Sequence, residues 1–218
     1  MIRLENITKT FVRDGHRKTV ANRLNVTFPT GVSVGLFGRN GAGKSTLLRI
    51  IAGTLKPSSG RVISDGTISW PVGFAGSFHG SLTGAQNARF IARVYGVDTD
   101  ALVEFVEDFA ELGHHFHLPI SSYSSGMLSR LAFGVSMGIR FDTYLVDEVT
   151  SVGDEAFRKK SKAVFLSRMR ASGAVVVAHS METMRQLCTM GVVLEHGELR
   201  VYDNIEYAIR AHLQNMQA

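Results

Sequence analysis

Residues 38–46 form a glycine-rich segment with the pattern G-x-x-x-x-G-K-[ST], which is typical of a loop that binds phosphate groups. Its glycines allow the backbone to wrap around a phosphate so that several N–H groups point inward. The helix predicted to begin at this loop adds partial positive charge. We expect Lys44 to meet the β- and γ-phosphates of a nucleotide and the Ser45 hydroxyl to bind Mg²⁺. The segment comprises Gly38, Arg39, Asn40, Gly41, Ala42, Gly43, Lys44, Ser45 and Thr46.

An apolar stretch that begins at Tyr144 ends in two acidic residues, Asp147 and Glu148. A strand of this kind places carboxylates at the carboxyl edge of a sheet, beside the phosphate loop. We expect Asp147 to hold Mg²⁺ through water and Glu148 to polarise the water that attacks the nucleotide. Taken alone, two acids also fit simple strand termination, and it is their combination with Lys44 that favours nucleotide hydrolysis.

Small residues begin a predicted helix at Ser124, within the sequence YSSGM of residues 123–127. The Ser124 side chain and the backbone N–H groups that follow it could hold a γ-phosphate. The alternative is an ordinary N-terminal helix cap, because serine is also a preferred capping residue.

The elements that must position these segments alternate between strands and helices. Strands linked by crossover helices predict a mostly parallel sheet. The helical stretch 84–140 is too long to be a loop and predicts an inserted helical subdomain. We expect strands at 2–8, 20–28, 32–37, 143–146 and 174–178, and helices at 44–53, 155–170, 181–188 and 205–213. The polar residues 13–18 are expected to form the turn between the first two strands. We also expect hairpins formed by 61–64 with 67–70, around Asp65-Gly66, and by 192–195 with 198–202, around His196-Gly197.

The composition is that of an ordinary globular protein, with 44% hydrophobic and 20% charged residues among 218. The single cysteine, Cys188, excludes an internal disulfide framework, and we expect it to be a small buried side chain. The start of the chain lacks the apolar run of a signal peptide, and no apolar run approaches the ~20 residues of a membrane span. We therefore expect a soluble, cytoplasmic chain.

The net charge of +5 is spread along the sequence without a run of five or more positive residues. A basic surface attracts nucleic acid or an anionic membrane face. A solvated surface of mixed charge fits this scattered pattern better. We expect no nucleic-acid partner.

The position of YSSGM, between the helical block and the acidic strand end, resembles that of the signature motif of the ABC ATPase family. That motif is usually LSGGQ; here Ser125 replaces the first glycine and Met127 replaces the glutamine. YSSGM is similar to the form found in polysaccharide-exporting members. The sequences ISWP (68–71), FHGSLTG (78–84) and VGDEAF (152–157) resemble capsular polysaccharide exporters.

This resemblance covers nearly the whole chain and implies one nucleotide-binding cassette over residues 1–218. The implied fold is α/β, of the P-loop NTPase class. It has a mostly parallel core sheet, an antiparallel β subdomain and an inserted helical subdomain over about 84–140.

The resemblance also implies roles for residues outside the phosphate loop. Phe11 stands where the family has an aromatic side chain that stacks on adenine, although a buried phenylalanine at a strand end is the alternative. His179 matches the switch histidine that contacts the γ-phosphate, and Asp154 belongs to the D-loop at 151–154. The signature residues that act on the ATP of a twin subunit are Ser124, Ser125 and Gly126.

The main departure from the family is at its Q-loop glutamine, which binds Mg²⁺ and senses the membrane partner. His79 stands where that glutamine would be. A neutral imidazole can accept a hydrogen bond or bind a metal, so we expect a coupling role; an exposed loop histidine is the alternative. The cluster of His114, His115 and His117 lacks acidic or cysteine companions at helical spacing, and a solvated loop is expected there.

The resemblance implies a Mg²⁺-dependent ATPase in which two copies pair head to tail. Each ATP then lies between Lys44 of one copy and Ser124 of the other. The implied partners are an integral membrane permease and periplasmic and outer-membrane capsule export components, with the chain at the cytoplasmic face of the inner membrane.

Three alternatives remain beside capsular polysaccharide export. Exporters of O-antigen or teichoic acid share part of the motif set but commonly carry an extra C-terminal domain, whereas this chain ends near Ala218. Soluble ABC ATPases of translation or DNA repair usually fuse two cassettes or insert a coiled coil. A phosphoryl-transferring kinase would give no reason for the signature or for His179.

Overall fold

The computed structural model describes residues 1–147, 153–178 and 180–217. Two of the expected catalytic residues, Glu148 and His179, therefore lie outside the described residues, as do 151 and 152 of the expected D-loop. The chain divides into two compact units. The first comprises Met1–Pro71, Phe141–Glu148 and Met169–Ala218, and the second comprises Val72–Arg140 and Val149–Arg168.

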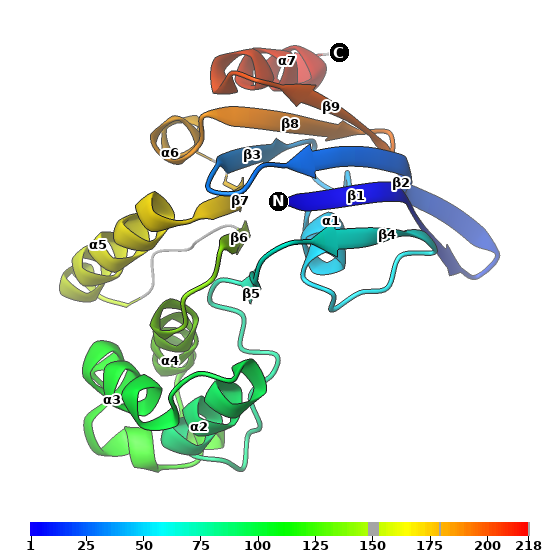
Figure 1. Cartoon of the computed structure of the whole chain (residues 1–218). Helices are drawn as coiled ribbons and strands as arrows, with labels where there is room; N and C mark the ends of the chain where they lie inside the picture. Colours follow the sequence, from blue (N-terminus) through cyan, green and yellow to red (C-terminus); the bar gives the residue numbers. More distant parts are fainter. Residues whose placement is uncertain (148–152, 179, 218) are drawn as a thin grey trace. The chain divides into compact units, whose positions relative to one another are not determined.

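The first unit contains two sheets (Figure 1). The core sheet has the order β5-β6-β7-β3-β8-β9, in which neighbours from β5 to β8 pair in parallel and β9 pairs antiparallel. The second sheet is antiparallel, with the order β2-β1-β4. Both expected sheets are thus confirmed. The strands are β1 (Ile2–Arg13), β2 (His16–Phe28), β3 (Ser33–Phe37), β4 (Ser59–Ser64), β5 (Ile68–Pro71), β6 (Thr143–Asp147), β7 (Gly173–Val177), β8 (Met190–Glu195) and β9 (Glu198–Tyr202).

The core of this unit joins both sheets to helix α1 (Lys44–Ile51). Leu47 and Leu48 of this helix are almost fully buried, and so are Val34 of β3 and Val175 of β7. Strands β3 and β7 are buried along their whole length, as expected for central strands of a parallel sheet that is covered on both faces. This packing fixes the start of α1 just beyond the end of β3.

The first hairpin is longer than the sequence predicted. The strands were expected to end at residue 8 and begin at residue 20, but β1 reaches Arg13 and β2 begins at His16, which pairs with Arg13. Asp14 and Gly15 have φ angles of 49° and 78°. Two successive positive φ angles are those of a type I′ turn, whose twist matches that of the paired strands. The polar residues 13–18 are therefore mostly strand rather than turn.

The hairpin predicted around Asp65-Gly66 is wrong, although both strands exist. β4 pairs with β1 in the antiparallel sheet, whereas β5 pairs with β6 in the core sheet. Asp142, next to β6, holds the start of β5: its Oδ2 accepts hydrogen bonds from the backbone N–H and the Oγ1 of Thr67, both at 2.7 Å. These bonds lower the pKa of Asp142. A local turn signal was outweighed by contacts with a residue far along the chain.

The second unit contains helices α2 (Gly84–Tyr95), α3 (Thr99–Ala110) and α4 (Ser125–Gly138), with 3₁₀ turns at Gly113–His117 and Ile120–Ser122. A Cβ on Gly138 would lie 2.4 Å from the Leu102 side chain, so glycine permits the close packing of α3 on α4. The expected histidine loop forms a 3₁₀ turn in which His114 and His117 are exposed to solvent, as predicted, and Phe116 is buried. There, His117 Nε2 lies 3.0 Å from Glu107 Oε1.

Three further helices complete the described chain: α5 (Glu155–Ala171), α6 (Met181–Leu187) and α7 (Ile205–Gln217). Cys188 is buried as expected, and burial raises the pKa of its thiol to about 12. Within the residues described, none of the helices combines the length and the hydrophobicity that a bilayer crossing requires.

His212 of α7 is a buried polar side chain, 9% exposed, whose ring lies 5.6 Å from that of Phe37 at the end of β3. In the described part of the chain its Nδ1 has no hydrogen-bond partner. Burial lowers the pKa of His212, the Lys44 ammonium lowers it further, and Glu195 opposes them. The fold therefore holds this imidazole in its neutral form.

We predict a loss of stability in mild acid that depends on His212. Because its pKa is lower in the folded than in the unfolded protein, its contribution is complete above about pH 6.5 and declines as the pH falls below that value. The thermal unfolding midpoint should fall less between pH 7.5 and pH 5.5 in H212L than in the wild type. H16Q, which changes an exposed histidine at the start of β2, is the control; an undiminished pH effect in H212L would contradict the prediction.

Candidate functional site

The loop 38–46 follows β3 and leads into α1, as the sequence predicted. Gly38, Gly41 and Gly43 have φ angles of +151°, +78° and +110°, in the region that side chains rarely adopt. A Cβ on Gly38 would lie 2.4 Å from the Leu194 carbonyl oxygen, and one on Gly43 would lie 2.9 Å from Cβ of Val20. Glycine is required here by both conformation and space.

Lys44 is the first residue of α1, and its side chain turns back over the loop. Its Nζ donates hydrogen bonds to the carbonyl oxygens of Gly38 at 2.8 Å and Arg39 at 3.2 Å. The helix start at Gly43 has no side-chain cap, so no side chain competes for this positive end of the helix. The arrangement gathers an ammonium group and helix amides in one place, as binding of an anion requires.

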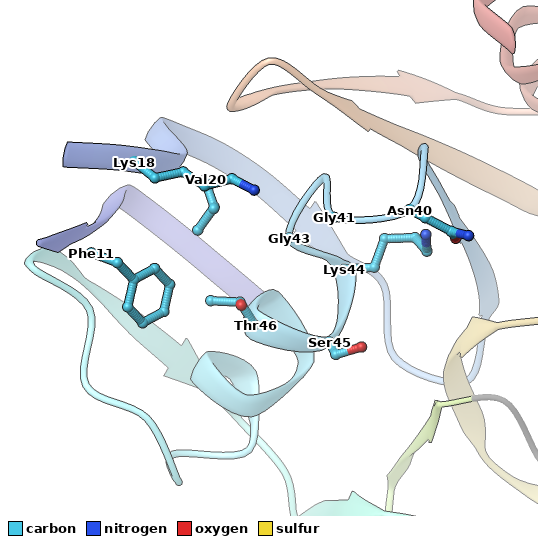
Figure 2. A pocket seen from close by; sticks show the side chains of 9 residues that line it. All are labelled: Phe11, Lys18, Val20, Asn40, Gly41, Gly43, Lys44, Ser45 and Thr46. Carbon is cyan, nitrogen blue, oxygen red and sulfur yellow. The ribbon is translucent and has the colours of Figure 1, made fainter. Parts of the chain in front are cut away.

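An open pocket of about 550 Å³ lies over this loop. Figure 2 shows the side chains that line it. It brings together Phe11 from β1 with most of the predicted loop residues, whereas Gly38, Arg39 and Ala42 are outside its lining. The lining contains ammonium groups and no carboxylate, which suits a polyanionic ligand. Its residues are Phe11, Lys18, Val20, Asn40, Gly41, Gly43, Lys44, Ser45 and Thr46.

Phe11 is 42% exposed, so the alternative of a buried phenylalanine is wrong. Its ring forms one wall of the pocket (Figure 2), and Lys9 Nζ lies 5.1 Å from the ring centroid. An exposed aromatic face beside a phosphate loop can stack on a planar base. The geometry suits the expected adenine contact.

Sequence reasoning missed Lys18 and Val20, which reach the pocket from β2. Lys18 pairs directly with Phe11 across the hairpin. The Asp14-Gly15 turn was the available signal, because a type I′ turn there fixes which residues of the strands oppose each other.

Ser45 and Asp147 carry oxygen atoms of the types that bind Mg²⁺. Asp147 ends β6, β7 lies between β6 and β3, and α1 contacts β6. Because all three strands run parallel, their carboxyl ends lie at one sheet edge, and β6 is about 10 Å from β3, the width of two strand spacings. A carboxylate and a hydroxyl oxygen are ligand types that Mg²⁺ accepts, with water completing its shell.

The predicted signature residues begin α4 in the second unit. Ser124 caps the helix, because its Oγ accepts a hydrogen bond from the Met127 N–H at 3.2 Å. Ser124, Ser125 and Gly126 are all exposed, and a Cβ on Gly126 would meet nothing nearer than 3.9 Å. Tyr123 anchors the segment by donating from its hydroxyl to the His115 carbonyl at 2.7 Å. The helix start is thus capped, fixed and open to solvent.

Asp154 directly precedes α5 and is bonded to the signature helix α4. Its Oδ1 accepts a hydrogen bond from the Phe157 N–H at 2.9 Å, and Arg130 of α4 donates to its Oδ2 at 2.7 Å. The Phe157 bond and then the Arg130 charge lower the pKa of Asp154. Arg130 is 18% exposed and lies 4.4 Å from the centroid of the Phe157 ring. These contacts hold the end of the expected D-loop on the helix that carries the signature.

His79 is exposed, and its Nδ1 accepts a hydrogen bond from the Ser81 N–H at 3.3 Å. The buried Asn87 orders this segment: its Oδ1 accepts from the His79 N–H at 2.8 Å, and its Nδ2 donates to the Thr83 carbonyl at 2.9 Å. Both alternatives for His79 remain compatible with an ordered, exposed imidazole.

The family model of the ABC transporter matches residues 21–151. The chain is 47% identical over 212 residues to the polysialic acid transport ATP-binding protein KpsT of Escherichia coli, covering 96% of this chain and 95% of that protein. It is 42% identical over 208 residues to the ATP-binding protein BexA of Haemophilus influenzae, covering 95% and 96%.

A solved structure supports the fold. The dimeric ATP-binding cassette MJ0796, bound to ADP and Pi in a post-hydrolysis state, superposes with a TM-score of 0.75 at 22% identity, covering 94% of this chain and 99% of that one. The expected cassette fold is therefore confirmed. With its phosphate loop, its acidic strand edge and these relatives, the chain belongs to the ABC transporter family and is one of its ATP-binding ATPases.

Proposed function

We propose that this chain is the ATPase subunit of an ABC transporter that exports capsular polysaccharide across the inner membrane. The observation that carries the proposal is the 47% identity to a polysialic acid transport ATP-binding protein over nearly the full length of both chains. The pocket over the phosphate loop supplies the matching chemistry. The transport relatives favour this function over a soluble ABC ATPase of translation or DNA repair.

The proposed nucleotide site lies in the first unit. Phe11 stacks on adenine, the loop amides and Lys44 bind the phosphates, and Asn40 and Thr46 complete the wall. Ser45 and Asp147 would hold Mg²⁺, which supplies positive charge to the phosphate oxygens when it is bound. In the proposed reaction Glu148 accepts a proton from the attacking water and His179 contacts the γ-phosphate.

The proposed active form is a homodimer in which the exposed start of α4 from one copy completes the ATP site of the other. Its open amides and the helix dipole suit a γ-phosphate. Asp154 and Arg130 then keep the D-loop and the signature in a fixed relation within each copy. Loss of the γ-phosphate removes contacts of this interface and so favours its opening.

The proposed partners follow from the transport function. The opening and closing of the dimer is transmitted to an integral membrane permease at the cytoplasmic face of the inner membrane. His79 lies in the segment that contacts this permease in the proposal. Periplasmic and outer-membrane components complete the export route. Residues 1–218 act in this proposal as a single cassette.

We predict that Gly43→Ala weakens ATP binding by about tenfold or more, because a side chain at this φ costs about 1–3 kcal/mol and here also meets Val20. Gly53→Ala is the matched control, since Gly53 has a φ of +73° but open space around it and lies outside the loop. Titration with a fluorescent ATP analogue measures both. Equal affinities of the two variants would contradict the role assigned to the loop.

We predict that Glu148→Gln binds ATP with nearly wild-type affinity but hydrolyses it at least about 100-fold more slowly, because an amide cannot accept the proton of the attacking water. The variant should accumulate as an ATP-bound dimer in size-exclusion chromatography. Glu155→Gln, a change of the same kind in the first turn of α5, is the control. Full hydrolysis by Glu148→Gln would refute the assignment.

The function itself is tested in capsule-forming cells that lack the native gene. We expect polysaccharide to accumulate inside these cells and to return to the surface when the wild-type chain is expressed. Lys44→Ala should restore neither surface polysaccharide nor ATPase activity, which should fall by at least about 100-fold. Antibody staining of intact and permeabilised cells separates the two locations. Normal surface polysaccharide in the deletion strain would overturn the proposal.

A further inference from the structure

Lys18 is a cation of the pocket that no recognised motif contains. It belongs to the long hairpin of β1 and β2, in which Arg13 pairs with His16, Val12 with Arg17 and Phe11 with Lys18. Directly opposed residues of an antiparallel pair project to the same face of the sheet. Lys18 therefore shares the face of Phe11, whereas Arg17 belongs to the other face, because successive side chains alternate.

The Lys18 side chain extends over the phosphate loop (Figure 2). Its Nζ lies 3.8 Å from the position that a Cβ on Gly41 would take. The ammonium is thus close to the backbone of the loop. A ligand whose base rests on Phe11 and whose phosphates reach Lys44 would lie in the pocket that Lys18 also lines.

Lys18 also lacks a competing anion. Among the residues that the structure describes, no carboxylate forms an ion pair with it, and no acidic side chain belongs to the pocket lining. The nearby Lys9 has a different arrangement, because its ammonium donates to the Lys56 carbonyl at 2.8 Å and lies over the Phe11 ring. A cation that faces an uncharged loop of backbone amides adds to the attraction for a polyanion.

We propose that Lys18 is a further nucleotide-binding residue, whose ammonium contacts the α- and β-phosphates of a nucleoside di- or triphosphate. The proposal rests on the proposed nucleotide site and extends it to the hairpin. The hairpin then supplies both the aromatic side chain for the base and a cation for the phosphates nearest to the base. Lys44 binds the β- and γ-phosphates. The contact depends on charge and is independent of the base.

The test compares K18Q, K18R and R17Q in equilibrium titrations with fluorescent analogues of ATP, ADP and GTP, and with AMP as a competitor. K18Q should bind ATP, ADP and GTP about three- to tenfold more weakly than the wild type, the range for one charge-assisted contact at an exposed site. The loss for AMP should be smaller than the loss for ATP and ADP, because AMP presents only one of the two phosphates that Lys18 contacts. K18R should restore most of the affinity for all three.

R17Q is the matched control, because it removes the same charge from the adjacent position on the opposite face. Its affinities should stay within about twofold of the wild type. The difference between K18Q and the wild type should shrink as salt rises from 50 to 500 mM, since the contact is exposed to screening.

The outcomes separate the two proposals. A wild-type chain that binds no nucleotide contradicts the nucleotide site and the Lys18 contact together. Normal binding of ATP and ADP by K18Q, or equal losses in K18Q and R17Q, overturns the Lys18 contact alone and leaves the site intact. Weaker binding of ATP but normal binding of ADP also overturns it, because such a result would place Lys18 on the γ-phosphate.

Discussion

The structure depends on bringing backbone amides and ammonium groups together in a small volume at the end of β3. Like charges and parallel N–H dipoles repel one another, so this convergence has to be imposed by the surrounding fold. The glycines at positions 38, 41 and 43 adopt backbone angles that side chains rarely reach, and two of them contact Leu194 and Val20 too closely for a Cβ. The backbone carbonyls of Gly38 and Arg39 accept hydrogen bonds from Lys44 and so partly compensate its charge.

The rest of the first unit follows from the need to hold this loop. The buried strands β3 and β7 form a rigid centre, and the apolar face of α1 packs into a core shared by both sheets. Asp147 reaches the same sheet edge because β6 is parallel to its neighbours. The imidazole of His212 is kept neutral by burial close to Phe37, at the point where the loop departs. Positive charge is therefore concentrated on the lysines of the pocket, whereas the buried imidazole of His212 stays uncharged.

The second unit holds the start of helix α4 in an ordered conformation while leaving it exposed to solvent. Tyr123 fixes the approach to α4, Ser124 caps it, and Arg130 links it to Asp154. The cap uses the Ser124 hydroxyl on its own helix, so the groups left for a ligand are the remaining amides and the helix dipole. An exposed helix end that is held by three separate contacts is well suited to an interface that opens and closes.

The sequence by itself determined the features that depend on neighbouring residues. The phosphate loop, the acidic strand end, the capped helix at Ser124 and the alternation of strands and helices were all predicted, because each arises from local conformation and short-range hydrogen bonds. The cassette class followed from the order of those motifs along the chain.

Only the tertiary structure decided which distant segments pair. The Asp65-Gly66 sequence is compatible with a hairpin, but bonds to Asp142 draw β5 into the core sheet. The place of Lys18 beside Phe11 depends on the register of a hairpin whose strands looked polar and loop-like. The ties of Asp154 to Arg130 likewise join residues 24 positions apart. Such contacts depend on the total packing and hydrogen-bond energy of the folded chain. A local sequence pattern does not contain that information.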